Sequence, residues 1–215
     1  MTSYDPSVAL IITSFNSAHY ISDAIESALT QTRKLFEIVV VDNGSTDETV
    51  SIAQQYPIDV LVNLDPGVGA SRNLGLSQTK SELIKFLDAD DLLLENAIAS
   101  LLESFTTMGC DLVYGQMSNF INPLISRTSI DKASKPIASP VALTSLLTRE
   151  SIARYGGFLD DQYSWMSWYL ASKRAGLRVA QIEQVVGLRR IHDDNFSKNA
   201  EYWKGIISIL RESSK

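Results

Sequence analysis

Short β-rich runs alternate with segments of helical periodicity along the first hundred residues, and this alternation restricts the possible folds of the chain most strongly. The runs occupy residues 8–12, 37–41, 58–62 and 83–87, and the first reads Val-Ala-Leu-Ile-Ile. Between the first two runs, apolar residues recur at helical spacing over residues 20–29. Strands that alternate with helices are typical of a parallel sheet covered on both faces. We therefore predict an α/β fold with a mainly parallel, doubly wound sheet and helices on both faces.

The rest of the chain continues this pattern less regularly. Residues 122–140 contain three prolines and are expected to form an irregular loop between two halves of one domain. A chain of 215 residues suffices for one well-buried domain and is short for two. We therefore predict a single domain over residues 1–215, with halves at about 7–117 and about 118–215. The other expected elements are helices ending near 55 and spanning 67–77, 95–107, 148–155, 164–175 and 202–210, and strands at 112–117 and 178–188.

Charge and hydropathy limit the partners and the location that we expect. The formal net charge is −6, so no nucleic-acid partner is expected, because such binders need a basic surface. No apolar run approaches the roughly 18 residues of a membrane-spanning helix, and the first residues lack a signal-peptide pattern. Cys110 is the single cysteine, which excludes an internal disulfide and favours a cytoplasmic location. Peripheral membrane contact through the tryptophan-bearing residues 165–168 is left open.

Three carboxylates, Asp88, Asp90 and Asp91, follow the fourth predicted strand within four residues. This concentration of negative charge favours a hard divalent cation, and Mg²⁺ or Mn²⁺ would also bridge to phosphate oxygens. The alternative is an ordinary turn in which Asp88 and Asp90 face solvent, and Asp91 is expected to cap the next helix under either interpretation. In sheets of this class ligands bind at the carboxyl ends of the strands, which favours a metal site here.

Asp42 and Asn43 follow the second predicted strand at the same edge of the sheet. An asparagine side chain offers both a donor and an acceptor, which suits the imide edge of uracil or thymine. We therefore predict that this pair binds a nucleotide. The alternative is a turn whose residues tolerate an unusual backbone angle. Ser45 and Glu48 have the spacing of a capping box for the helix that follows.

A glycine-containing loop at Gly67 and Gly69 leads into a predicted helix that carries Arg72. Arg72 is a candidate for contact with a phosphate or a base, and the alternative is a structural ion pair with one of the acidic clusters. A dinucleotide fingerprint is disfavoured, because Arg72 stands where the third glycine belongs and the loop follows the third strand. The Gly-Lys-Ser/Thr ending of a P-loop does not occur in the sequence.

Four segments, in this order and spacing, resemble family 2 of the inverting glycosyltransferases, which have the GT-A fold. They read LIITSFN at residues 10–16, VVVDNGSTD at 39–47, GASRNLG at 69–75 and FLDADD at 86–91. The resemblance implies transfer of a sugar, with inversion, from a nucleotide diphosphate sugar. The acceptor is not specified by these segments, and a saccharide or a lipid-linked saccharide is among the candidates.

The resemblance also implies roles for individual residues. It implies that Asp90 ligates Mg²⁺ or Mn²⁺, which would neutralise the charge that develops on the departing nucleoside diphosphate. Asn43 falls where the family often has an aspartate that contacts a pyrimidine, so a pyrimidine nucleotide is slightly favoured. The residues implied to line the base, the ribose or the diphosphate are Thr13, Phe15, Asn43, Arg72 and Asp88.

The second half departs from the family pattern at the residues that would activate the acceptor. After a turn at residues 156–158, Ser164 and Trp165 stand where the family usually carries Glu and Asp. Neither side chain is a competent base near neutral pH. Asp160 and Asp161 are the nearest substitutes for the catalytic base, and the alternative is a solvated turn before a helix. The rival interpretation is a non-catalytic nucleotide-binding protein that has lost turnover.

Arg190 and His192 resemble the Arg-x-His segment that closes the site in many relatives. The resemblance implies that Arg190 binds the nucleotide diphosphate and that His192 contributes to the metal site. The alternatives are a surface arginine and a structural histidine. Trp165 and Trp168 lie three residues apart on one predicted helical face and either pack in the core or stack on a sugar ring.

Overall fold

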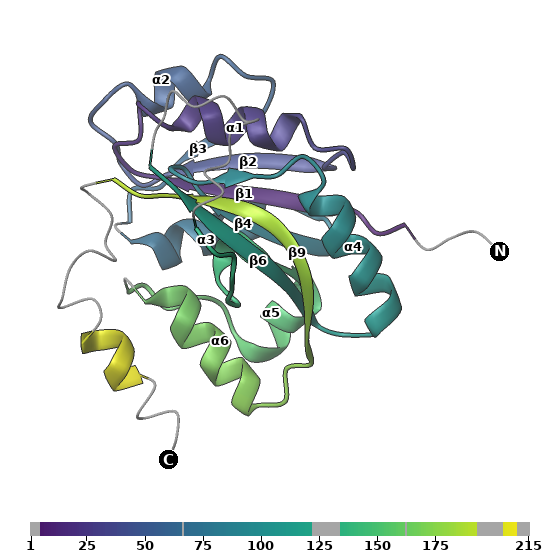
Figure 1. Cartoon of the computed structure of the whole chain (residues 1–215). Helices are drawn as coiled ribbons and strands as arrows, with labels where there is room; N and C mark the ends of the chain where they lie inside the picture. Colours follow the sequence, from purple (N-terminus) through teal and green to yellow (C-terminus); the bar gives the residue numbers. More distant parts are fainter. Residues whose placement is uncertain (1–4, 66, 122–133, 162, 193–203, 210–215) are drawn as a thin grey trace.

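A computed structural model describes residues 5–65, 67–121, 134–161, 163–192 and 204–209 of the chain. A single nine-stranded sheet forms the centre of the molecule, with helices packed on both of its faces (Figure 1). The strands are β1 (Val8–Ser14), β2 (Glu37–Asp42), β3 (Asp59–Val62), β4 (Leu83–Asp88), β5 (Leu92–Leu93), β6 (Leu112–Phe120), β7 (Ile137–Ala138), β8 (Ser145–Thr148) and β9 (Val179–Arg190). The helices are α1 (Ile21–Leu29), α2 (Thr49–Ala53), α3 (Val68–Gln78), α4 (Ala97–Met108), the 3₁₀ helix η1 (Ala142–Thr144), α5 (Arg149–Tyr155) and α6 (Ser164–Arg174), and residues 204–209 are also helical.

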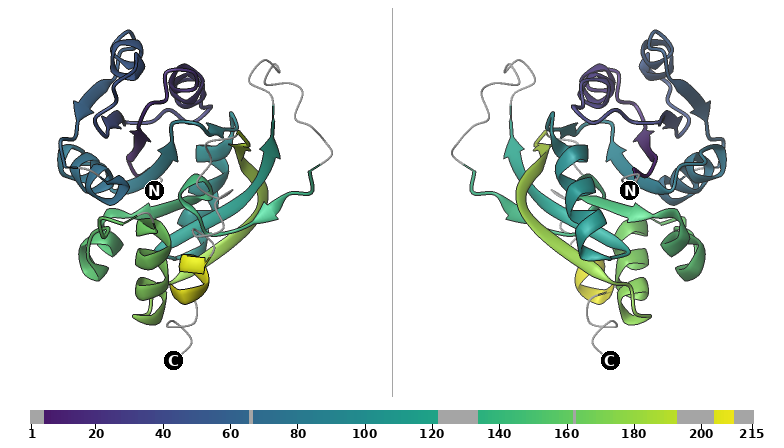
Figure 2. Two further views of the ribbon diagram at one scale, coloured as in Figure 1. Left: turned by 90° about the vertical axis from the view of Figure 1, so that its left-hand side faces the viewer. Right: turned by 90° about the vertical axis from the view of Figure 1, so that its right-hand side faces the viewer.

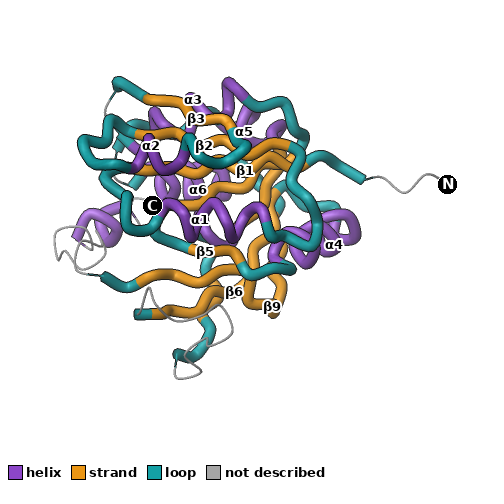
Figure 3. Tube along the Cα trace, turned by 90° about the horizontal axis from the view of Figure 1, so that it is seen from above, coloured by secondary structure: helices purple, strands orange, loops and turns teal. Residues whose placement is uncertain are grey.

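The sheet has the order β3-β2-β1-β4-β8-β6-β9-β5, and β7 pairs with β6. Figure 3 shows β3, β2 and β1 following one another in this order. The longest strand pairs, β1 with β2, β1 with β4 and β6 with β9, are parallel. The shorter strand β8 runs antiparallel to both β4 and β6. The predicted α/β class and the mainly parallel sheet are therefore confirmed.

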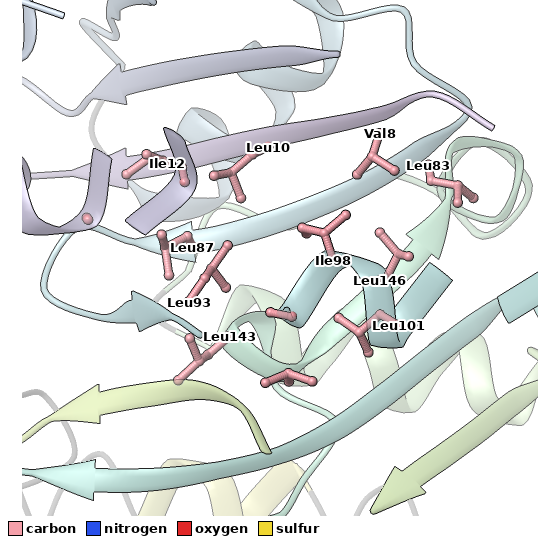
Figure 4. Packing of buried hydrophobic residues seen from close by; sticks show 14 of the residues in the cluster. Val8, Leu10, Ile12, Leu83, Leu87, Leu93, Ile98, Leu101, Leu143 and Leu146 are labelled. Carbon is pink, nitrogen blue, oxygen red and sulfur yellow. The ribbon is translucent and has the colours of Figure 1, made fainter. Parts of the chain in front are cut away.

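Two helical layers cover the sheet, and strand β1 shows why. Every residue of β1 is buried, and its side chains alternate between the two layers. Val8, Leu10 and Ile12 pack with α1 and α4, as Figure 4 shows for Ile98 of α4. The residues between them pack in the second cluster, on the side of α5 and α6. Figure 2 shows these helices on opposite sides of the sheet.

Strand β8 was not expected, because residues 145–148 were not assigned to a strand and the helix was predicted to begin at 148. The run Ser-Leu-Leu-Thr lies between β4 and β6, where Leu147 pairs with Ile84 on one side and Leu112 on the other. Helix α5 begins directly afterwards, and Thr148 caps it by accepting a hydrogen bond from the Ser151 amide at 2.9 Å. The strand therefore depends on neighbours that are distant in the sequence.

Trp165 and Trp168 of α6 belong to the core, so the stacking-platform alternative is wrong. Both side chains are buried in the cluster that contains Phe86 and Phe158. Their indole nitrogens donate to backbone carbonyls, Trp165 to Pro140 and Trp168 to Gly156. These tryptophans therefore give no support to membrane contact. Within the described ranges, the structure has no helix with the length and apolar character that crossing a bilayer requires.

Candidate functional site

The predicted polar clusters meet at one edge of the sheet. Parallel pairing sets Ser14 beside Asp42 and Thr13 beside Asp88, so β1, β2 and β4 end together. Strand β9 is parallel to β6 and brings Arg190 beside Phe120 at the end of β6. The carboxyl ends of the strands therefore form the candidate site, as expected for this class of sheet.

The carboxylate of Asp42 is buried and fully engaged within the protein. It accepts hydrogen bonds from Ser14 Oγ at 3.0 Å, from the Ser45 amide at 2.7 Å and from Ser45 Oγ at 2.5 Å. Only 1% of the residue is exposed. The contacts that the structure gives Asp42 hold the turn after β2, and nucleotide contact by Asp42 stays a prediction.

Asn43 uses its carbonyl oxygen inside the protein. Oδ1 accepts from the Gly67 amide at 3.1 Å, from Ser71 Oγ at 3.3 Å and from Asn63 Nδ2 at 3.5 Å. Because a backbone amide can only donate, the Gly67 contact fixes which end of the side-chain amide faces α3. Within the described part of the chain, the Nδ2 group makes no hydrogen bond, and it is not among the buried unpaired atoms. Asn43 thus offers a ligand a donor, and its acceptor is already used.

Phe15 lies in a loop that is tied to the turn after β2. Asn16 has a positive φ of 45°, its amide donates to Ser45 Oγ at 2.8 Å, and its Oδ1 accepts from the Thr46 amide at 2.9 Å. These bonds hold Phe15 at the edge of the sheet with 57% of its surface exposed. An exposed aromatic ring on a well-anchored loop is suited to stacking on a base.

Arg72, Asp88, Thr13 and Ser164 form one hydrogen-bonded network. Asp88 Oδ1 accepts from Thr13 Oγ1 at 3.0 Å and pairs with Arg72 Nη2 at 3.3 Å. Arg72 Nη1 donates to Ser164 Oγ at 2.6 Å, and its guanidinium lies over the rings of Phe86 and Phe158. Arg72 is almost fully buried, whereas 43% of the Asp88 side chain is exposed. Asp88 is therefore the member of this network that a ligand can reach most easily.

Asp160 and Asp161 lie near this network but make structural contacts. Asp160 sits over the start of α3, and its Oδ1 accepts from the Ala70 amide at 3.4 Å. A Cβ at Gly67, which has a φ of 134°, would lie 1.5 Å from that oxygen, so the close approach needs glycine there. Asp161 Oδ1 accepts from the Tyr163 amide at 2.7 Å in the turn before α6. The role of either carboxylate as a base stays a prediction.

The charged forms of the carboxylates after β4 are disfavoured by burial and by one another. Burial raises the pKa of Asp90, and the nearby Asp88 carboxylate raises it further. Burial also raises the pKa of Asp91 well above its ordinary value, with Asp90 and Asp88 adding to the effect. Asp91 does not cap the next helix as predicted: its Oδ1 accepts from the Arg190 amide at 3.0 Å, and Asn96 precedes α4.

A buried lysine lies on the same strand. Lys85 is fully buried, and its Nζ donates to the carbonyls of Phe86, Ala142 and Leu143 at 2.6–2.9 Å. Burial lowers the pKa of Lys85 to about 7, although Asp88 and Asp91 oppose the shift. Strand β4 therefore carries both the buried amino group of Lys85 and, at its end, the first carboxylate of the acidic cluster, Asp88.

Asp90 and His192 come together across 102 residues of sequence. His192 Nε2 lies 2.9 Å from Asp90 Oδ2, and both side chains are partly accessible. A carboxylate and an imidazole form a donor set that Mn²⁺ accepts, and a carboxylate suits Mg²⁺. Among the described residues no group of three or more metal-binding side chains occurs. The pair fits a cation that also takes phosphate and water ligands, which is common for Mg²⁺.

Arg190 is buried beside this pair. Its Nε donates to the Asp90 carbonyl at 2.9 Å, and its Nη2 pairs with Asp23 of α1 at 2.9 Å. Only 1% of Arg190 is exposed, so direct contact with a nucleotide would require the side chain to move. The predicted nucleotide contact is untested. Asp23 could not be predicted as a neighbour of this site, because its partner lies 167 residues away and no local pattern links them.

Comparison with known proteins shows which family the chain resembles. The family model for glycosyl transferase family 2 matches residues 9–141. An uncharacterized glycosyltransferase of Rickettsia prowazekii is 41% identical over 97 residues, which are 44% of this chain and 30% of that protein. Glycosyltransferase GlyG of Streptococcus pneumoniae is 31% identical over 119 residues, which are 53% of this chain and 40% of GlyG. The matched segment thus covers less than half of either relative.

Solved structures share the fold at low sequence identity. S. aureus TarS in complex with UDP-GlcNAc has a TM-score of 0.72 and 17% identity, covering 95% of this chain and 66% of that one. The mannosyltransferase PcManGT of Pyrobaculum calidifontis, in complex with GDP-Man and Mn²⁺, has a TM-score of 0.72 and 19% identity, covering 96% and 62%. The family model covers more than half of the chain and includes all four segments quoted from the sequence, and on that basis the chain belongs to glycosyl transferase family 2.

Proposed function

We propose that this chain binds a nucleotide diphosphate sugar at the carboxyl edge of its sheet and transfers the sugar, with inversion, to an acceptor. The observation that carries the proposal is the pair formed by Asp90 and His192 at 2.9 Å, next to the exposed carboxylate of Asp88. Two protein ligands leave most positions of a cation to a diphosphate and water. A site of this kind therefore binds its metal and its donor together.

Asp90 and His192 would hold Mg²⁺ or Mn²⁺, which supplies charge neutralisation for the leaving nucleoside diphosphate. The chain's own residues orient the donor. Phe15 offers a ring for the base, and Asp88 offers a carboxylate that Arg72 and Thr13 hold in place. The complex of PcManGT with GDP-Man and Mn²⁺ supports a divalent cation in a protein of the same fold.

The donor nucleotide is proposed to carry a pyrimidine. The complex of TarS with UDP-GlcNAc is consistent with this choice, whereas PcManGT was crystallised with GDP-Man. The acceptor is proposed to be a saccharide or a lipid-linked saccharide, reached from the cytoplasm or from the membrane surface. Asp160 and Asp161 remain the candidates for the base, because no other carboxylate was predicted near the start of α6.

A second candidate function is nucleotide-sugar binding without turnover. Ser164 is fully buried and accepts a hydrogen bond from Arg72, and Trp165 is packed in the core. Neither residue can supply the acidic pair that the family usually carries at these positions. Replacing Trp165 by Asp would remove a core side chain at a cost of about 3–5 kcal/mol. Ser164→Glu alone is therefore the informative variant, and a large gain in transfer would favour a lapsed enzyme.

Calorimetric titration with UDP, dTDP and GDP, each with and without Mn²⁺, tests the proposed donor site. We expect one nucleotide to bind at least about tenfold more tightly with Mn²⁺, and Asp90→Ala to remove this difference. Asp59→Ala, which changes an exposed carboxylate on β3, serves as the control. A folded protein that binds none of the three nucleotides would contradict the proposal.

A further inference from the structure

The first turn of α1 lies against the pair formed by Asp90 and His192, and Arg190 connects them. Arg190 Nη2 pairs with Asp23 of α1 at 2.9 Å, while Nε of the same guanidinium donates to the Asp90 carbonyl at 2.9 Å. The Arg190 backbone amide donates to Asp91 Oδ1 at 3.0 Å. One residue of β9 therefore bonds to the main chain of Asp90 and to the side chain of Asp91, and it ties the acidic turn to α1.

Aromatic rings fix the plane of this guanidinium. The Arg190 Cζ atom lies 5.0 Å from the ring centre of Tyr20 and 4.6 Å from that of Phe120. Tyr20 also packs against the imidazole of His192, with ring centres 4.9 Å apart and planes inclined by 34°. Tyr20 thus contacts both Arg190 and His192.

One nitrogen of the Arg190 guanidinium is left unsatisfied in this arrangement. Arg190 Nη1 is buried and has no hydrogen-bond partner among the residues that the structure describes. An unsatisfied buried donor costs about 1–3 kcal/mol, and such groups are rare in native structures. A lysine could not bond to Asp23 and the Asp90 carbonyl through separate nitrogens, because it has a single donor nitrogen. Two nitrogens of the guanidinium thus bond to separate partners while the third donor is unsatisfied.

We propose that Tyr20, Asp23 and Arg190 are positioning residues that set the geometry of Asp90 and His192 for a divalent cation. This inference rests on the proposed function. Arg190 holds the backbone from which the Asp90 carboxylate projects, and Tyr20 holds the ring plane of His192. Residues that orient metal ligands typically change metal affinity by about 10- to 100-fold when they are replaced.

Mn²⁺ binding to the full chain, followed by the electron paramagnetic resonance of the free ion, tests the proposal. The titration is run with the nucleoside diphosphate that binds best among UDP, dTDP and GDP. We expect Asp23→Ala and Tyr20→Leu each to weaken Mn²⁺ binding by about tenfold or more. Binding of the same nucleotide without metal should change by less than about twofold. Asp23→Glu should recover most of the lost Mn²⁺ affinity, because it restores the ion pair.

Asp111→Ala is the matched control, because Asp111 pairs with Arg178 at the opposite end of β6. It should lower the melting temperature without changing Mn²⁺ affinity. Wild-type Mn²⁺ affinity in both folded test variants would overturn the inference and leave the proposed function intact. Equal losses of Mn²⁺ binding and of metal-free nucleotide binding would also overturn it, because they indicate general disruption. A wild-type protein that binds no Mn²⁺ with any of the nucleotides would instead overturn the proposed function.

Discussion

The ends of β2 and β4 both carry carboxylates at the same edge of the sheet, yet their environments are opposite. Asp42, at the end of β2, is buried and receives hydrogen bonds from Ser14 and Ser45. Asp90, after β4, shares its surroundings with two other carboxylates, and its pKa is raised by burial and by Asp88. The first carboxylate is stabilised by its neighbours, whereas burial and Asp88 disfavour the charged form of the second more strongly than His192 favours it.

This difference separates a carboxylate whose charge is satisfied within the protein from one whose charge is disfavoured there. A group whose charge is fully satisfied by the protein gains little from a ligand. A cluster whose charges repel gains stability when a cation or a cationic side chain approaches. Among the described carboxylates at this edge, the turn after β4 is accordingly the better candidate for metal binding, although the two segments have similar acidic character in the sequence.

The largest effect that tests this difference between Asp42 and Asp90 is expected from replacing Asp42. Asp42→Ala removes the acceptor of three hydrogen bonds in a buried turn, so we expect the free energy of unfolding to fall by about 3 kcal/mol. Urea denaturation measures the change. Asp59→Ala, on the exposed side of β3, should change stability by less than about 0.5 kcal/mol. If Asp42→Ala is as stable as wild type but loses nucleotide binding, Asp42 is functional and the distinction fails.

Lys85 makes the β4 end respond to pH in a way that the β2 end does not. Its pKa in the folded protein is about 7, below the ordinary 10.5, so the unfolded chain binds more protons between these values. Stability should therefore rise with pH in this window, by about 2 kcal/mol between pH 7 and 9. Lys85→Met should remove this rise, measured as the difference from wild type in urea denaturation at each pH. Lys80→Met, at an exposed lysine, should leave the rise unchanged, and a rise that persists in Lys85→Met would refute the assignment.

Asp90→Asn should reveal the repulsion after β4 directly. The folded-state pKa of Asp90 is raised above 3.8, so its ionised form destabilises the fold once the pH exceeds that range. At pH 7 without metal, the variant should be more stable than wild type by on the order of 1 kcal/mol. The gap should close below pH 3.8, where wild-type Asp90 is protonated. A variant that is less stable than wild type at pH 7 would show that Asp90 is satisfied within the protein.

The first half of the fold could be predicted because its signals are local. The strands β1, β2 and β4 are rich in apolar residues, with Lys85 as the one charged residue inside β4, and such runs identify strands that are covered on both faces. Strand β8 gave no such signal, since it is four residues long and is defined by pairing with β4 and β6. The start of helix α5 was predicted at residue 148, one residue before its observed start at Arg149.

The polar contacts of the site were harder to predict, because the same side chain can bond to several partners. Ser45 and Glu48 have capping-box spacing, but Ser45 bonds to Asp42 and α2 has no side-chain cap. The pairing of Arg190 with Asp23 joins distant segments and has no sequence signature. Asn43 was correctly singled out as lying at this edge of the sheet. Its oxygen was expected to be available to a base, and its bonds to α3 change that expectation.

Asn43→Asp is expected to give the smallest effect of these variants. It tests whether the side chain that follows β2 forms hydrogen bonds with the base. Wild-type Asn43 offers a ligand only its Nδ2 donor, so it should not favour uracil, whose N3–H needs an acceptor, over cytosine, whose N3 accepts. The carboxylate of the variant can keep one oxygen on the Gly67 amide and present the other. We expect calorimetry to show the preference for UDP over CDP rising about fourfold, or about 0.8 kcal/mol. Asn96→Asp, at the exposed start of α4, controls for the added charge. An unchanged ratio would mean that the base does not meet Asn43, and the β2 end would then be structural throughout.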